Sequence, residues 1–227
     1  MPLSLIPTFS SRAPLLLLVS YLLLRENVTS APICVKRDGD TQKTLEKLFK
    51  LTTFMSQITR SQAAKMFTEF DKQYAQGKSY NDRFPDSCPT DSFDTPENKE
   101  QVLESNPEVL LNLISSLLYS WSDPLFHLVN EMSALQGDTY AILSKAREIQ
   151  AKFEELRMGV KAILNKIGEK DNDTHVVWSG LPSLQSSNED VRHFSFYNLI
   201  RCLLRDSHRV NTYFEVLKYR MIHQSNC

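Results

Sequence analysis

The sequence predicts an all-α protein, an up-up-down-down four-helix bundle with two long crossover loops. Two observations predict it: four segments carry apolar residues at helical spacing, and the connections between them differ in length. Residues 75–104 and 168–187 are long, rich in turn formers and not periodic, whereas residues 133–139 are short. Parallel neighbouring helices need a connection that runs the length of the bundle, so two long links and one short link favour this topology.

The first two helical segments differ in the regularity of their apolar pattern. The first, near Thr41 to Tyr74, is looser because threonines dilute its stripe. The second opens with a capping box and an early proline, Ser105-Asn106-Pro107-Glu108. Pro124 is expected to bend this helix without ending it, because the apolar pattern resumes at once. The stripes are Leu45, Leu48, Met55, Met66 and Phe70, then Leu110, Ile114, Leu117, Trp121, Leu125, Leu128 and Met132.

The third and fourth segments have the most regular stripes, with apolar residues at alternating steps of four and three. Only Ser207 interrupts the last stripe. Each of these faces needs a partner surface, so we interpret them as the core of the bundle. The residues are Ile142, Ala146, Ile149, Phe153, Leu156, Val160, Ile163 and Ile167, then Ile200, Leu203, Val210, Phe214, Leu217 and Met221.

The N-terminus has the pattern of a secretory signal peptide, residues 1–30, followed by one domain, residues 31–227. Arg12 precedes an uncharged run of twelve residues, 13–24, and small residues follow. Such a run is too short to span a bilayer, which takes about 20 residues, and no later segment comes closer. We therefore expect a secreted, extracellular protein that does not insert into a membrane.

Composition argues against nucleic-acid binding and catalysis. Without residues 1–30, the chain has 24 basic and 26 acidic residues and a net charge of −2, whereas nucleic-acid binders are usually basic. The glycines form no phosphate-binding loop, and the HExxH, CxxC and GxSxG motifs do not occur. The five histidines have no metal-ligand spacing on one helical turn. We expect no enzymatic activity, no cofactor and no metal.

The four cysteines, Cys34, Cys88, Cys202 and Cys227, all lie after the predicted signal peptide. In an oxidising compartment they are expected to form two disulfides, for which three pairings are possible.

The polar side of the last helical segment is the main candidate interaction surface. Arginines recur there at steps of four on the face opposite Ile200 and Leu203. One interpretation is an ordinary solvated helix face. The other is a binding surface, because arginine and tyrosine beside apolar residues are typical of interface hot spots. The polar residues are Arg201, Arg205, His208, Arg209, Tyr213, Lys218, Arg220 and His223.

The last thirty residues closely resemble the C-terminal signature of the prolactin family, which also includes growth hormones and placental lactogens. Further motifs follow the family in order along essentially the whole chain after residue 30. They are NLIRCLLRDSHRVNTYFEVLKYRMIHQSNC (198–227), MFTEFDKQYAQGK (66–78), TPENKEQ (95–101), SWSDPLFHLVNE (120–131), AILSKAREI (141–149) and VWSGLPSLQ (177–185).

This resemblance implies a helical cytokine fold and a hormone that holds two cytokine-receptor chains together. In the family, the first receptor site combines the last helix, part of the first helix and the first crossover. The second lies between the first and third helices, where Gly159 matches the family's glycine and leaves room for a receptor. We expect an arginine at this position to point into solvent, to leave the fold undisturbed and to abolish signalling by blocking the second receptor.

Three positions depart from prolactin. Gln57 and Arg60 replace two histidines of the first helix, and Glu215 replaces a lysine on the receptor face of the last helix, whereas His208, Arg209 and Tyr213 match. A reversed charge at an interface can cost several kcal/mol. The sequence is therefore typical of a placental or decidual prolactin-related protein. We expect it to act either through a prolactin-receptor-type cytokine receptor or, having lost that receptor, through another surface or matrix partner such as a glycosaminoglycan.

The resemblance also implies that Cys88 pairs with Cys202. Thr41 and Tyr219 stand where prolactins have the partners of Cys34 and Cys227. We predict a Cys34–Cys227 bridge in a monomer, because both cysteines lie on tails at the same end of such a bundle. A covalent dimer and capped thiols are the alternatives.

Asn172 is the predicted glycosylation site. It opens the sequon Asn172-Asp173-Thr174 in the polar second crossover.

Overall fold

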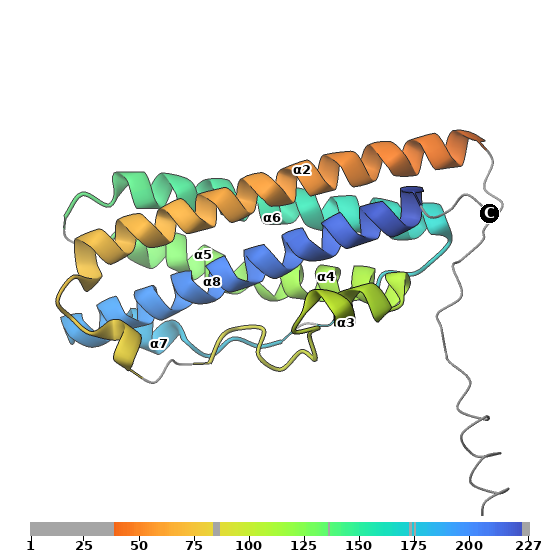
Figure 1. The fold of residues 1–227 in the computed structure, drawn as a ribbon. Coiled ribbons are helices and arrows are strands. Elements are labelled where there is room, and N and C mark those ends of the chain that lie inside the picture. The colour runs from red at the N-terminus through yellow and green to blue at the C-terminus, as the bar shows by residue number, and fades with distance from the viewer. Residues whose placement is uncertain (1–38, 84–86, 136, 173, 175, 224–227) are drawn as a thin grey trace, which may run out of the picture. The chain divides into compact units, whose positions relative to one another are not determined.

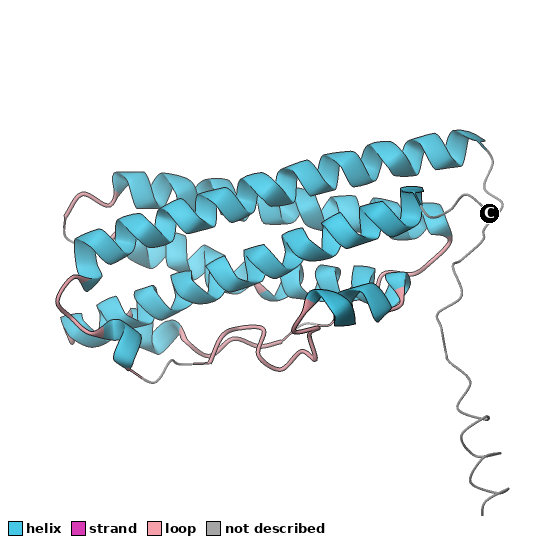
Figure 2. Ribbon diagram, viewed as in Figure 1, coloured by secondary structure: helices cyan, strands magenta, loops and turns pink. Residues whose placement is uncertain are grey.

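The computed structural model describes residues 39–83, 87–135, 137–172, 174 and 176–223. The chain divides into two units, Met1–Ala31 and Pro32–Cys227, and every described residue belongs to the second. All regular secondary structure of the described residues is helical (Figure 2).

Five helices build the bundle, with shorter ones in the connections. The bundle helices are α2 (Gly39–Phe70), α4 (Pro107–Ser120), α5 (Ser122–Met132), α6 (Tyr140–Ile167) and α8 (Glu189–Lys218). The π-helices η1 (Asp71–Ala75) and η3 (Tyr219–His223) extend α2 and α8. The crossovers contain the 3₁₀-helix η2 (Tyr80–Asp82), α3 (Lys99–Glu104) and α7 (Leu181–Leu184), none of which the periodicity predicted.

The helices have the predicted up-up-down-down topology (Figure 1). Helix α2 and the pair α4–α5 run in one direction, and α6 and α8 run in the other. The first crossover returns the chain along α8 to the end where α2 begins, and the second returns it to the start of α8. The expected fold class is therefore confirmed.

Pro124 ends the helix, contrary to our expectation of a bend. Helix α4 stops at Ser120 and α5 starts at Ser122, with Trp121 between them. Proline has no N–H, so the carbonyl of Ser120 loses its helical donor, and the proline ring also crowds that carbonyl. The apolar stripe nevertheless continues, because Trp121 and Leu125 are both buried.

The predicted stripes form one core. All members named above are buried except Leu48 and Ile167, which are partly buried against it. The polar residues within the stripes are buried too. Their hydroxyls donate to carbonyls of their own helix: Thr52 to Leu48 at 3.0 Å, Thr59 to Met55 at 2.9 Å and Ser207 to Leu203 at 2.7 Å. Satisfied in this way, they interrupt the apolar pattern at little cost.

Asparagines cap the N-termini of α3, α4 and α8. Asn106 Oδ1 accepts from the backbone N–H groups of Glu108 and Val109, so the cap of α4 is Asn106, one residue after the predicted Ser105. Asn98 and Asn188 cap α3 and α8 in the same manner. Among the described helices, none is both long and apolar enough to cross a membrane.

Candidate functional site

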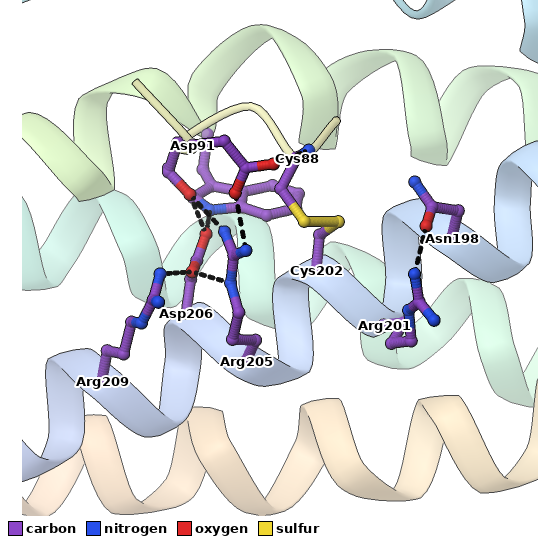
Figure 3. The surroundings of a disulfide bond; sticks show 10 residues. Cys88, Asp91, Asn198, Arg201, Cys202, Arg205, Asp206 and Arg209 are labelled. Atoms are coloured by element: carbon purple, nitrogen blue, oxygen red, sulfur yellow. Dashed lines mark hydrogen bonds and ion pairs between the residues drawn. A yellow bond between two sulfur atoms is a disulfide. The ribbon is translucent and has the colours of Figure 1, made fainter. Parts of the chain in front are cut away.

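The three arginines that recur at steps of four on the predicted surface are all engaged within the molecule (Figure 3). Arg205 donates to Asp206 at 2.9 Å and to Asp91 of the first crossover at 2.6 Å. Arg209 reaches the same oxygen of Asp206 at 3.3 Å, and Arg201 donates to the side-chain oxygen of Asn198 at 2.8 Å. These arginines therefore form hydrogen bonds and ion pairs within the protein itself.

Asp206 is the centre of this network, and our sequence interpretation did not single it out. Its side chain is 0% exposed. Besides the two arginines, it accepts hydrogen bonds from Trp121 Nε1 at 2.9 Å and Thr90 Oγ1 at 2.5 Å. A buried carboxylate needs such donors. One signal was present: Asp206 lies three residues after Leu203 and four before Val210, within the apolar stripe.

The disulfide beside this network joins Cys88 to Cys202 (Figure 3). The two Cα atoms are 5.5 Å apart, and the residues are 114 positions apart in sequence. Cys202 is buried on α8, whereas Cys88 is in the first crossover. The bond is the pairing that the resemblance implied.

Tyr213 is not on the surface, in contrast to our expectation of a receptor-contacting residue. It is 1% exposed, and its hydroxyl donates to the carbonyl of Pro96 at 3.2 Å. Burial raises the pKa of Tyr213 to about 12, so it stays neutral. The crossover covers this part of α8, and Tyr213 holds it there.

The first crossover is bound along α8 from end to end. Asp190, near the start of α8, accepts from Arg83 at 2.7 Å and from Tyr80 at 3.1 Å. Near the other end, Arg220 donates to the Ser105 carbonyl. Between them lie the disulfide, the Asp206 network and the Tyr213 bond. The sequence separation of the paired residues stays between 107 and 117, so the crossover and α8 run in parallel register.

The edge of α8 that faces α2 is more open. His208 and Glu215 are exposed there, opposite the exposed Gln57 and Arg60 of α2. Glu215 accepts from Gln57 Nε2 at 3.3 Å and from Asn211 Nδ2 at 3.0 Å. The pKa of His208 is lowered by desolvation and by the charge of Arg60, although Glu215 opposes the shift. These four residues, Gln57, Arg60, His208 and Glu215, form what we call the α2–α8 face.

Gly159 lies against α2, not in open space. A Cβ atom at this position would be 2.5 Å from Cγ2 of Thr52. Thr52 is buried, and its hydroxyl is bonded to its own helix, so its methyl group has little freedom to move. The expectation that an arginine here would point into solvent without disturbing the fold is therefore wrong. The missing side chain lets α2 and α6 approach each other.

The model of the somatotropin hormone family matches residues 17–227. The chain belongs to the somatotropin hormone family. Two similar relatives are both Prolactin-2B1. That of Rattus norvegicus is 64% identical over 220 residues, which are 96% of each chain, and that of Mus musculus is 63% identical over 228 residues, which are 100% of each chain.

Somatotropin-family hormones are signalling proteins without enzymatic activity, and they are secreted and bind cytokine-type receptors. The expectation that this chain is no enzyme agrees with that membership. Within the part of the chain that the structure describes, no group of three His, Cys, Asp or Glu residues could hold a metal ion.

The structure divides the predicted site residues of this family member into two groups. Arg60, His208 and Glu215 come together on the α2–α8 face, whereas Arg205 and Tyr213 hold the first crossover. Arg201 and Arg209 bind side chains of α8 itself, and Gly159 packs against α2. Cys34 and Cys227 lie outside the described residues.

Asn172, the predicted glycosylation site, is exposed on the second crossover. Its backbone N–H donates to Asn112 Oδ1 at 2.9 Å, and that of Thr174 donates to Ser116 Oγ at 3.0 Å, so hydrogen bonds to α4 hold both residues.

Proposed function

We propose that residues 31–227 act as a secreted hormone that binds a cytokine receptor of the prolactin-receptor type through the α2–α8 face, after residues 1–30 are removed as a signal peptide. The observation that carries this proposal is the position of His208. It matches the prolactin pattern and is exposed, whereas the neighbouring Tyr213, which also matches, is buried. A receptor that approaches this edge would contact the imidazole of His208, which lies near the cation of Arg60 and the carboxylate of Glu215.

Glu215 supports a second candidate, a hormone that has left the prolactin receptor for another surface or matrix partner. The carboxylate stands where prolactin has a lysine, and two amide groups hold it in place. Its negative charge is thus fixed on the surface, where a receptor patch complementary to lysine would repel it.

Titration against immobilised prolactin-receptor ectodomain separates the two candidates. The wild type, His208→Ala and Glu215→Lys are compared, with Lys166→Ala on α6 as the control. Under the first candidate the wild type binds, His208→Ala weakens binding at least tenfold, and the control does not change it. Under the second, the wild type does not bind and Glu215→Lys restores binding. If the wild type binds and His208→Ala binds equally tightly, the assignment of the α2–α8 face is contradicted.

Asn172 is the glycosylation site in this proposal. Its exposure on the second crossover supports it, because a glycan there would not occupy the α2–α8 face.

A further inference from the structure

Lysines occupy the outward face of α2 and of the turn that follows it. Lys43, Lys47, Lys50 and Lys65 lie on α2, and Lys72 lies in η1. All five are exposed. They fall on one repeating set of positions, 43, 47, 50, 54, 61, 65, 68 and 72, whose steps of three, four and seven return to the same side of a helix. The remaining members of the set are Phe54, Ser61 and Thr68.

This row of lysines points away from the rest of the bundle. Helix α2 contacts α6 through residues such as Thr52 and Gln62, and it contacts α8 through Ser56. The lysine positions lie on the side of α2 that faces neither helix, and Figure 1 shows that α2 runs along one edge of the bundle. From Lys43 to Lys65 the row extends about 33 Å, at 1.5 Å per residue.

The positive charge of the row is largely uncompensated. Considering only the described residues, Lys43, Lys47, Lys65 and Lys72 make no ion pair, and Lys50 pairs with Glu46 at 2.5 Å. Glu69 pairs with Lys145 of α6 at 3.0 Å. The other carboxylates of the segment, Asp40 and Asp71, lie at its two ends. Because residues 31–227 have a net charge of −2, this row is a local concentration of cations on an acidic protein.

We propose that this row binds a linear sulfated polysaccharide of the glycosaminoglycan class. A straight row of cations can follow a linear polyanion, and each contact releases counterions. A bilayer surface fits less well, because membrane-bound helices bury a broad apolar face, whereas Phe54, 60% exposed, is the one large apolar member of this set. The proposal gives the matrix partner of the second candidate a chemical class and a binding surface, and it uses none of the residues of the α2–α8 face.

Heparin chromatography tests the proposal. The wild type is compared with Lys43→Gln/Lys47→Gln/Lys65→Gln and with a control of equal charge change, Lys99→Gln/Lys166→Gln/Lys170→Gln. We expect heparin to retain the wild type and the control at about 0.15 M salt, the physiological ionic strength, and the α2 variant to elute much earlier. The slope of log affinity against log salt should fall by about 2 to 3 for the three lost contacts. Far-UV circular dichroism verifies that all three proteins are folded.

Three results would overturn the inference. The first is a wild type that heparin does not retain at that salt. The second is an equal shift in elution for both triple variants, which would mean that net charge alone decides. The third is binding of the wild type to vesicles of phosphatidylcholine and phosphatidylserine that soluble heparin does not displace. None of these results depends on receptor binding, so the two proposals stand or fall separately.

Discussion

The two polar edges of α8 carry similar residues and use them differently. On the edge toward the first crossover, Arg205 and Arg209 surround the buried Asp206, and Tyr213 is covered. On the edge toward α2, His208 and Glu215 remain exposed. The first edge stabilises the hormone, and the second is free to contact a partner. A basic helix face is therefore a binding surface only where the chain does not already use it.

Removing the disulfide should cause the largest loss of stability on the crossover edge. The Cys88→Ser/Cys202→Ser variant frees a loop of more than 100 residues, and the chain-entropy model gives a loss of about 4 to 5 kcal/mol. Urea unfolding measures it. Because the bond lies on the closed edge, we expect receptor affinity of the protein that remains folded to change little. An unfolding free energy within about 1 kcal/mol of the wild type would show that the side-chain network suffices without the bond.

The Asp206→Ala variant should lose about 3 kcal/mol. It leaves Trp121 Nε1 and the guanidinium of Arg205 buried or half-buried without their acceptor. Asp91→Ala is the matched control, because it removes the exposed partner of the same arginine and should cost less than about 1 kcal/mol. Thermal and urea unfolding give both values. Equal losses for the two variants would mean that burial of the carboxylate does not decide the effect.

Gly159→Ala should destabilise the contact of α2 with α6 by about 1 to 2 kcal/mol, because overpacking outweighs the gain in helix propensity. Thr52→Ser removes the methyl group that the new Cβ would meet. The double variant should therefore be more stable than Gly159→Ala alone. Unfolding of the wild type, the two single variants and the double variant forms a double-mutant cycle. Additive effects would contradict direct contact.

The smallest effect concerns pH and the start of α8. His193 is buried, and desolvation lowers its pKa below the ordinary 6.5, although Glu189 opposes this. The unfolded chain therefore takes up a proton at a higher pH than the folded chain does. Stability is fully present above pH 6.5 and falls as the pH drops through 6.5 toward the folded pKa. We expect His193→Gln to flatten this dependence more than His208→Gln, because His208 is more exposed. If the unfolding free energy of His193→Gln depends on pH as steeply as that of the wild type, another group is responsible for the dependence.

The fold was predictable because it depends on the spacing of apolar residues and on the lengths of the connections, and both can be read directly from the sequence. Leu110 and Ile149 are buried as their spacing predicts. The break at Trp121 was missed because the apolar pattern continues across Pro124, while the loss of the backbone hydrogen bond does not show in that pattern.

The candidate site was less predictable, because its outcome depends on which loop covers which helix. Arg205 and His208 look equally available in the sequence, yet one lies under the first crossover and the other does not. The periodicity of α8 assigns both residues to its polar side and gives no information about Asp91 or Pro96, more than 100 residues earlier. Only the three-dimensional path of the crossover distinguishes them.

The parallel register between the first crossover and α8 has a consequence for biosynthesis. For the described residues of 80–105, the hydrogen bonds, ion pairs and disulfide that hold them on the bundle all end in the last 38 residues of the chain, from Asp190 onward. At the ribosome, Cys88 emerges 114 residues before Cys202. At about 5 to 20 residues per second, roughly 6 to 23 s pass before its partner is synthesised. The first crossover can therefore form its bonds to the bundle only when translation is almost finished. A nonsense mutation in the second crossover, between α6 and α8, would release a chain that has its first three helical segments but none of the residues that bind the first crossover.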